Sequence, residues 1–160
     1  MPELFSNNAT APDFSLSNAQ DKVVSKADFQ GNWLLLYFYP KDNTPGCTVE
    51  AKDFSYYLEE FDKLNVKIVG VSKDSVKSHS NFIAKHDLKI ELLSDPELKA
   101  IKAYKAWGIK KNYGREYEGL IRSTFLINPQ GLIAKYWHNV KAKGHAERIL
   151  KETNKIINNN

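Results

Sequence analysis

An uninterrupted apolar run, Trp33 to Tyr39, constrains the fold of this chain more than any other feature. Seven residues suit a central strand that is covered on both faces. A membrane helix would need about 18 apolar residues or more, so the run is far too short to span a bilayer as a helix. Pro40 ends it. The sequence therefore predicts a buried strand in a sheet with helices on its faces.

A helix is expected soon after this strand. Phe54, Tyr57, Leu58 and Phe61 fall at i, i+3, i+4 and i+7, which places them on one helix face. The loop 41–45 precedes this pattern, with Thr44 as the expected N-cap and Pro45 at the first helical position. Gly46 and Cys47 then lie in the first turn.

The rest of the chain alternates between strand and helix patterns. Strands are expected near 13–16, 22–25, 66–72 and 92–93, a hairpin at 125–127 and 132–134, and helices at 75–88, 96–104 and 145–157. This order predicts an α/β sandwich whose mixed sheet is parallel in the middle and antiparallel at the hairpin.

Composition favours one domain covering residues 1–160. The chain is 42% hydrophobic and 26% charged, and no Pro/Gly/Ser-rich linker divides it. Lys and Arg number 23 against 19 Asp and Glu, a net charge of +4 that is spread along the sequence. One cysteine and the lack of a signal pattern at the N-terminus predict a cytoplasmic protein that is not bound to a membrane.

The single cysteine is the main candidate for chemistry. Cys47 is expected where a strand gives way to a helix, and sites in open α/β sheets gather at the carboxyl ends of strands. Free N–H groups and the helix dipole at that point favour a thiolate over a thiol. From position alone, a buried and inert cysteine remains an equal alternative.

The residues around Cys47 resemble a known family. The stretch Pro40 to Cys47 matches the peroxiredoxin pattern of proline, three residues, threonine, two residues and cysteine. With its flanks it is similar to the bacterioferritin-comigratory, or peroxiredoxin Q, branch, as are the segments 11–14, 69–74, 93–95 and 119–127. The resemblance implies a thioredoxin-like sandwich with an N-terminal strand extension, and a peroxidase that reduces hydrogen peroxide and organic hydroperoxides.

The resemblance also implies roles for the residues beside the sulfur. Cys47 attacks the peroxide and becomes a sulfenic acid. The Thr44 hydroxyl donates to the peroxide and accepts from a backbone N–H, while Pro40 shields the sulfur from water.

Three further residues complete the implied site. Arg122 stabilises the thiolate and the polarised O–O bond, because its rigid fork serves two acceptors at once. Glu50, one turn after Cys47, orients the arginine. The N–H of Gly46, with that of Cys47, points at the peroxide oxygens.

The chain departs from many members of this branch in lacking a second cysteine. The places where they carry a resolving cysteine are expected at Lys52 and Ile101. The resemblance then implies a one-cysteine enzyme whose sulfenic acid reacts with an outside thiol: thioredoxin, glutaredoxin, glutathione or a second copy of the chain. A monomer or weak homodimer is expected.

Two other functions stay open at this point. The stretch 44–47 also reads as a thioredoxin-type motif without its first cysteine, which is typical of a monothiol disulfide- or glutathione-handling protein. Segment 99–117 mixes basic and aromatic residues, as single-stranded nucleic acid requires, although a solvated helix face with inward aromatics is the favoured interpretation. The four histidines lack metal-ligand spacing and are interpreted as surface or packing residues, so no metal and no cofactor is expected.

Overall fold

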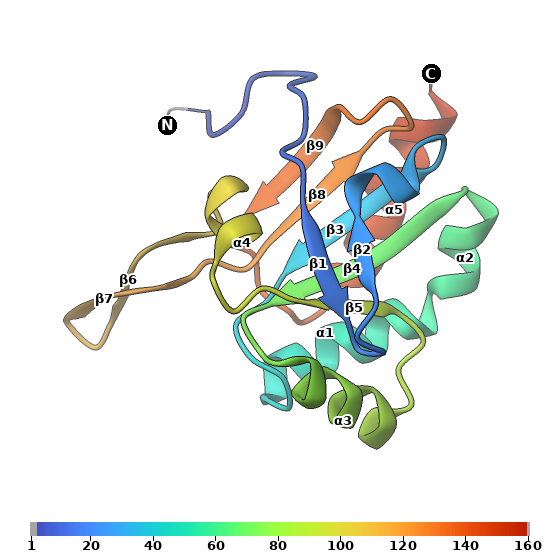
Figure 1. The fold of residues 1–160 in the computed structure, drawn as a ribbon. Helices are drawn as coiled ribbons and strands as arrows, with labels where there is room; N and C mark the ends of the chain where they lie inside the picture. The colour runs from blue at the N-terminus through green and yellow to red at the C-terminus, as the bar shows by residue number, and fades with distance from the viewer. Residues whose placement is uncertain (1–2, 160) are drawn as a thin grey trace.

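The computed structural model describes residues 3–159, and a seven-stranded mixed sheet forms its centre (Figure 1). Its strand order is β2-β1-β5-β4-β3-β8-β9. The strands of this sheet are β1 (Ser15–Asn18), β2 (Val23–Ser25), β3 (Trp33–Phe38), β4 (Val66–Ser72), β5 (Glu91–Ser94), β8 (Ser123–Ile127) and β9 (Ile133–His138).

Helices lie on both faces of this sheet (Figure 1). They are the 3₁₀ helix η1 (Lys26–Phe29) and the α-helices α1 (Pro45–Tyr56), α2 (Leu58–Lys63), α3 (Val76–His86), α4 (Lys99–Ala103) and α5 (His145–Asn158). Within the described residues, none of these helices has the length and apolarity needed to cross a membrane.

The predicted central strand β3 lies between β4, which runs parallel to it, and β8, which runs antiparallel. Its side chains alternate between two cores. Leu34, Leu36 and Phe38 face a core closed by α4 and the N-terminal segment, while Leu35 and Tyr37 face a core shared with α1, α2, α3 and α5. The apolar run is continuous because both faces of this strand are buried.

The sheet is parallel across β3, β4 and β5 and antiparallel at its edges, as predicted. The N-terminal strands pair with each other, and β1 adds to the sheet beside β5. This mixed sheet, with helices on both faces and an N-terminal strand extension, is the predicted α/β sandwich.

The first helix is shorter than its apolar pattern suggests. Tyr57, with φ −91° and ψ 7°, separates α1 from α2, so the four-residue apolar pattern spans two helices. Phe54 and Phe61 are nevertheless fully buried in one core. The pattern correctly predicted the buried face but not the interruption.

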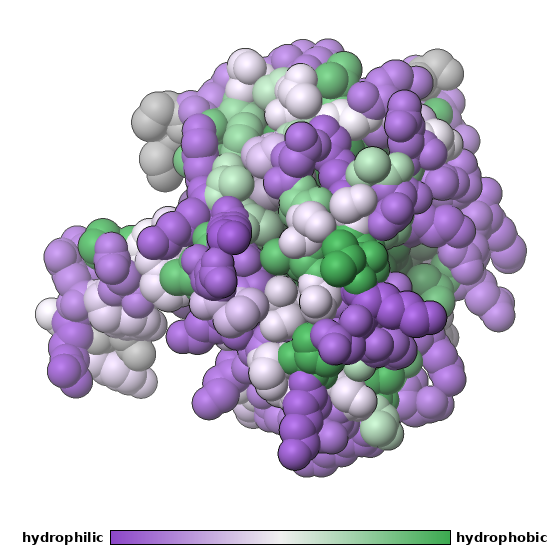
Figure 2. Space-filling model, viewed as in Figure 1, coloured by the Kyte–Doolittle hydropathy of each residue, from purple (hydrophilic) through white to green (hydrophobic). Residues whose placement is uncertain are grey.

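The predicted helix face over 99–117 is wrong beyond the first turn. α4 ends at Ala103, and a separate two-stranded hairpin follows, made of β6 (Trp107–Asn112) and β7 (Arg115–Leu120). The hairpin projects from the rounded body, and most of its surface is hydrophilic (Figure 2). Tyr113 at its tip is 98% exposed. The aromatic side chains are therefore not packed inward as a group.

Candidate active site

Cys47 occupies the first turn of α1, as predicted. Thr44 is the N-cap and Pro45 is the first helical residue. The first hydrogen bond of the helix runs from the Thr48 N–H to the Thr44 carbonyl, at 2.9 Å. The N–H groups of Gly46 and Cys47 precede it and have no partner within the helix. The sulfur itself is buried, since Cys47 is only 1% exposed.

Arg122 reaches this sulfur from the short link between β7 and β8. Its Nη2 donates to Cys47 Sγ at 3.2 Å, and its Nη1 donates to Glu50 Oε1. The arginine side chain is 15% exposed and the glutamate side chain is fully buried. Residues 75 positions apart therefore meet at the start of α1, and the two ends of one guanidinium hold the sulfur and the carboxylate together.

Burial dominates the ionisation of the carboxylate. It raises the pKa of Glu50 to about 7, although the attraction of Arg122 acts in the opposite direction. Burial also lowers the pKa of Arg122, but the negative charges of Glu50 and Cys47 outweigh it and raise that pKa above its ordinary value. Glu50 Oε2 and the nearby Tyr37 hydroxyl are buried without a hydrogen-bond partner among the described residues. Glu50 is thus the group here that changes charge near neutral pH.

The other predicted site residues, Pro40, Thr44 and Gly46, lie in the loop before Cys47 or at its end. The Thr44 hydroxyl donates to the Lys41 carbonyl at 2.8 Å and makes no bond to the helix N–H groups, unlike the prediction. This bond uses the single hydrogen of the Thr44 hydroxyl, and it helps to hold the loop in this conformation. Pro40 follows β3 and is half-buried, while Gly46 is exposed. A Cβ on Gly46 would lie 3.5 Å from Arg122 Nη2, so the arginine runs close beside the first turn.

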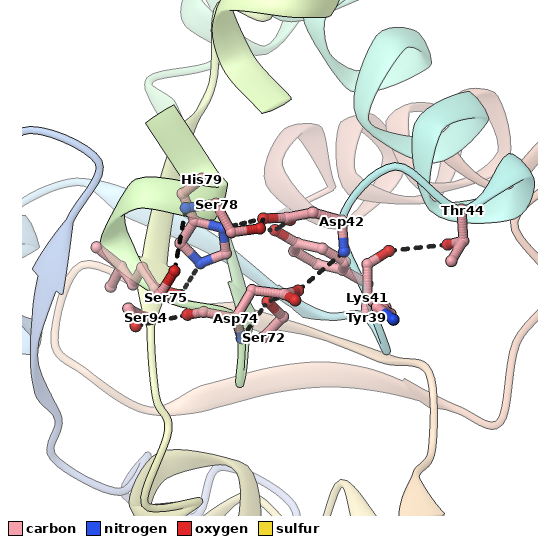
Figure 3. Close-up of polar contacts among 11 residues, drawn as sticks. Tyr39, Lys41, Asp42, Thr44, Ser72, Asp74, Ser75, Ser78, His79 and Ser94 are labelled. Atoms are coloured by element: carbon pink, nitrogen blue, oxygen red, sulfur yellow. Dashed lines mark hydrogen bonds and ion pairs between the residues drawn. The ribbon is translucent and has the colours of Figure 1, made fainter. Parts of the chain in front are cut away.

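Sequence reasoning missed a second polar cluster, which joins the same loop to α3 (Figure 3). Asp42 Oδ1 accepts from the Tyr39 hydroxyl at 2.6 Å, and its Oδ2 faces His79 Nδ1 at 2.7 Å. His79 was expected at the surface or in packing; it is fully buried and ion-paired. The signal was available, because loops after adjacent parallel strands meet at one edge of a sheet.

Asp42, Asp74 and His79 also place three ligand atoms within 4.8 Å of one another. Each of these side chains already has hydrogen-bond partners within the protein: Asp42 accepts from Tyr39, Ser72 donates to Asp74 Oδ2 at 2.7 Å, and His79 Nε2 faces the Leu93 carbonyl at 2.9 Å. We therefore interpret the cluster as a hydrogen-bonded support for the loop rather than as a metal centre.

The sequence pattern of the AhpC/TSA family matches residues 8–136, which is most of the chain. The chain belongs to this family. It is 51% identical over 141 residues to the bcp protein of Helicobacter pylori, covering 88% of this chain and 93% of the relative. It is 46% identical to peroxiredoxin Bcp of Bacillus subtilis, covering 88% and 90%. Because the chain belongs to the AhpC/TSA family and is about half identical to these peroxiredoxins over most of its length, it is a thiol peroxidase of the peroxiredoxin class.

Solved structures of this AhpC/TSA branch support the same assignment. Peroxiredoxin Q of Xanthomonas campestris superposes with a TM-score of 0.85 at 42% identity, covering 90% of this chain and 91% of that one. The bacterioferritin comigratory protein of the same organism, solved as a trapped intermediate or ligand complex to study its alkyl peroxide reduction, superposes with a TM-score of 0.86. The Xanthomonas protein has been solved with serine in place of each of two different cysteines, whereas this chain has one.

Proposed function

We propose that Cys47 is the peroxidatic residue of this enzyme and that Arg122, held by Glu50, activates both the sulfur and the peroxide. The contact that supports this proposal is the 3.2 Å approach of Arg122 Nη2 to Cys47 Sγ at a helix N-terminus. The positive guanidinium and the free N–H groups stabilise negative charge that develops on the sulfur. They also stabilise the negative charge that moves to the leaving oxygen.

The reaction begins with attack of the Cys47 thiolate on the terminal peroxide oxygen. A new S–O bond forms as the O–O bond breaks, and the leaving hydroxide or alkoxide takes a proton and departs as water or alcohol. The sulfur is oxidised to a sulfenic acid and the hydroperoxide is reduced. Gly46 and Cys47 N–H groups would bind the peroxide oxygens, and Pro40 would limit the access of water.

Thr44 has a narrower role in this proposal than the sequence suggested. Its hydroxyl hydrogen is engaged by the Lys41 carbonyl, so donation to a bound peroxide requires that bond to be exchanged. In the resting enzyme the threonine fixes the backbone that leads into α1.

An external thiol would complete the cycle. It displaces the sulfenic oxygen as water to give a mixed disulfide, and a second thiol releases the reduced enzyme. No cysteine other than Cys47 exists in the chain to perform this step. Thioredoxin, glutaredoxin, glutathione and a second copy of the chain are the reductants we consider.

We further propose a single domain over residues 1–160, a cytoplasmic location, a monomer or weak homodimer, and an enzyme that needs no cofactor and has no nucleic-acid partner. The comparisons do not favour the alternative of a monothiol disulfide- or glutathione-handling protein, because the relatives are peroxiredoxins.

Replacement of the sulfur tests the proposal directly. Cys47→Ser should abolish consumption of hydrogen peroxide and cumene hydroperoxide in the presence of dithiothreitol, since a serine hydroxyl is a poor nucleophile at neutral pH. Circular dichroism should show an intact fold. Wild-type protein alkylated with iodoacetamide provides the control and should be equally inactive. Substantial turnover by the serine variant would place the chemistry elsewhere.

A further inference from the structure

The loop between β3 and α1 is held by a buried ion pair that the peroxidase chemistry does not use (Figure 3). Asp42 and His79 side chains are 2% and 0% exposed, and their facing atoms are 2.7 Å apart. His79 Nε2 faces the Leu93 carbonyl, which can only accept, so this nitrogen carries a hydrogen. The 2.7 Å approach of Nδ1 to Asp42 Oδ2 then requires one shared proton between them, so a short, charge-assisted hydrogen bond joins the two groups.

Further hydrogen bonds tie Asp42 to neighbouring segments. Its carboxylate accepts from the Tyr39 and Ser78 hydroxyls, at 2.6 and 2.7 Å. Its backbone N–H donates to Asp74 Oδ2 at 2.8 Å. Asp42 thereby connects the loop to the β4–α3 junction and to α3. Through His79, the connection extends to β5.

The burial of Cys47 makes this connection relevant to the second half of the reaction. A hydroperoxide is small, but a thiol reductant must bring its own sulfur to about 2 Å from Sγ. With Cys47 only 1% exposed, a thiol on a bulky molecule cannot reach that distance until the first turn of α1 or the loop before it moves.

Ionic contacts reach α1 and the loop before it from two places, through Arg122 and through His79, and oxidation of the sulfur weakens only the contact between Arg122 and Cys47. Arg122 attracts the thiolate, and this attraction weakens when the sulfur becomes a neutral sulfenic acid. The Asp42–His79 pair makes no hydrogen bond to the sulfur, so oxidation of Cys47 leaves it intact. After oxidation, Arg122–Glu50 still holds α1, and Asp42–His79 is the ion pair that holds the loop itself.

We propose that the Asp42–His79 pair is a latch that holds Cys47 in its peroxide-reactive position, and that release of this latch admits the thiol that reduces the sulfenic acid. His79 is a positioning residue in this scheme and touches no reactant. The inference rests on the proposed function, because it requires Cys47 to be the peroxidatic residue. A weaker latch should slow the peroxide step and accelerate the thiol step.

The test measures the two half-reactions separately in wild-type protein, His79→Gln and His86→Gln. Stopped-flow tryptophan fluorescence follows oxidation by hydrogen peroxide. The colour lost by 5-thio-2-nitrobenzoate follows its mixed-disulfide formation with the sulfenic acid. His86 is the matched control, since it also joins α3 to this loop, through Asn43 at 3.2 Å, but in an exposed contact.

The expected result is a change of opposite sign in the two rates. His79→Gln should slow peroxide oxidation about tenfold and speed mixed-disulfide formation about tenfold, while His86→Gln should change each by less than about twofold. If His79→Gln alters neither rate, or lowers both together as general loss of structure would, the latch is overturned.

A second variant covers the case in which His79→Gln fails to fold. The double substitution Asp42→Asn with His79→Gln removes both charges and keeps two amides that can hydrogen-bond, so no buried charge is left unpaired. It should show the same opposite changes, and equal or parallel rates would overturn the latch. A wild-type protein whose Cys47 does not react with peroxide would instead defeat the proposed function itself.

Discussion

Two buried ion pairs flank the loop that leads into α1, and they differ in how completely their atoms are bonded. In the Glu50–Arg122 pair, one carboxylate oxygen lacks a partner among the described residues and the pKa of Glu50 is raised to about 7 by burial. In the Asp42–His79 pair, both carboxylate oxygens accept hydrogen bonds. The pair that contacts the Cys47 sulfur can change its charge near neutral pH, whereas the other has every carboxylate oxygen hydrogen-bonded.

Arg122→Ala should have the largest effect on this contrast. The variant loses the donor at the sulfur, so we expect peroxide oxidation to slow by about 100- to 1,000-fold, the usual loss for one charge-stabilising donor. The oxidation rate of Arg122→Lys should lie between those of the wild type and Arg122→Ala, because a single ammonium cannot serve Cys47 and Glu50 together. Stopped-flow oxidation by hydrogen peroxide measures this rate.

Arg115→Ala is the matched control for that substitution. Arg115 is exposed on the hairpin, and its removal should leave the peroxide rate unchanged. An Arg122→Ala rate within a few-fold of wild type would show that the two ion pairs do not differ in catalytic importance.

Glu50 should make the free energy of unfolding depend on pH, an effect that ranks second in size among these predictions. Its folded pKa of about 7 lies above the ordinary 4.5, so the folded protein holds the proton more tightly than the unfolded chain does. This stabilisation is complete below pH 4.5 and is lost as the pH rises through 7, amounting to roughly 3 kcal/mol at about 1.4 kcal/mol per tenfold change in proton affinity.

Glu50→Gln keeps the shape of the side chain and removes this titration. Urea unfolding between pH 4.5 and 8 should therefore show the wild type losing stability relative to the variant as pH rises. A constant difference between the two proteins across that range would mean that Glu50 is ionised throughout and resembles the fixed pair after all.

Ser78→Ala should have the smallest effect. Asp42 Oδ2 accepts from Ser78 and also faces His79, so the loss of one donor leaves no orphaned oxygen. We expect a cost of about 1 kcal/mol in urea unfolding and a peroxide rate within about twofold of wild type. A loss several times larger would show that the second pair, too, depends on every donor.

The sequence predicted the parts of the molecule that depend on local pattern. The apolar run gave the central strand, and the spacing of Thr44, Pro45 and Cys47 gave the start of α1, because N-caps and buried strands are encoded by adjacent residues. Arg122 was predicted through resemblance alone. The structure confirms that it lies beside the sulfur.

The parts that were missed depend on contacts across the chain. Asp42 and His79 are 37 positions apart, and although the centre of the sheet was predicted to be parallel, residue spacing does not show which side chains beyond the strand ends form a pair. The hairpin was missed for another reason. Its strands are largely exposed, so they lack the alternation of apolar and polar residues that identifies a half-buried strand.

That hairpin also determines where the chain can change length. Its turn, Tyr113-Gly114, has positive φ at both residues, 53° and 77°, the backbone of a tight two-residue reversal. At the other end, the Ile121 N–H binds the Ala106 carbonyl at 2.7 Å and closes the base just before Arg122. Residues inserted at the tip would extend the arm outward without displacing the arginine, so the length of this hairpin can change independently of the chemistry at Cys47.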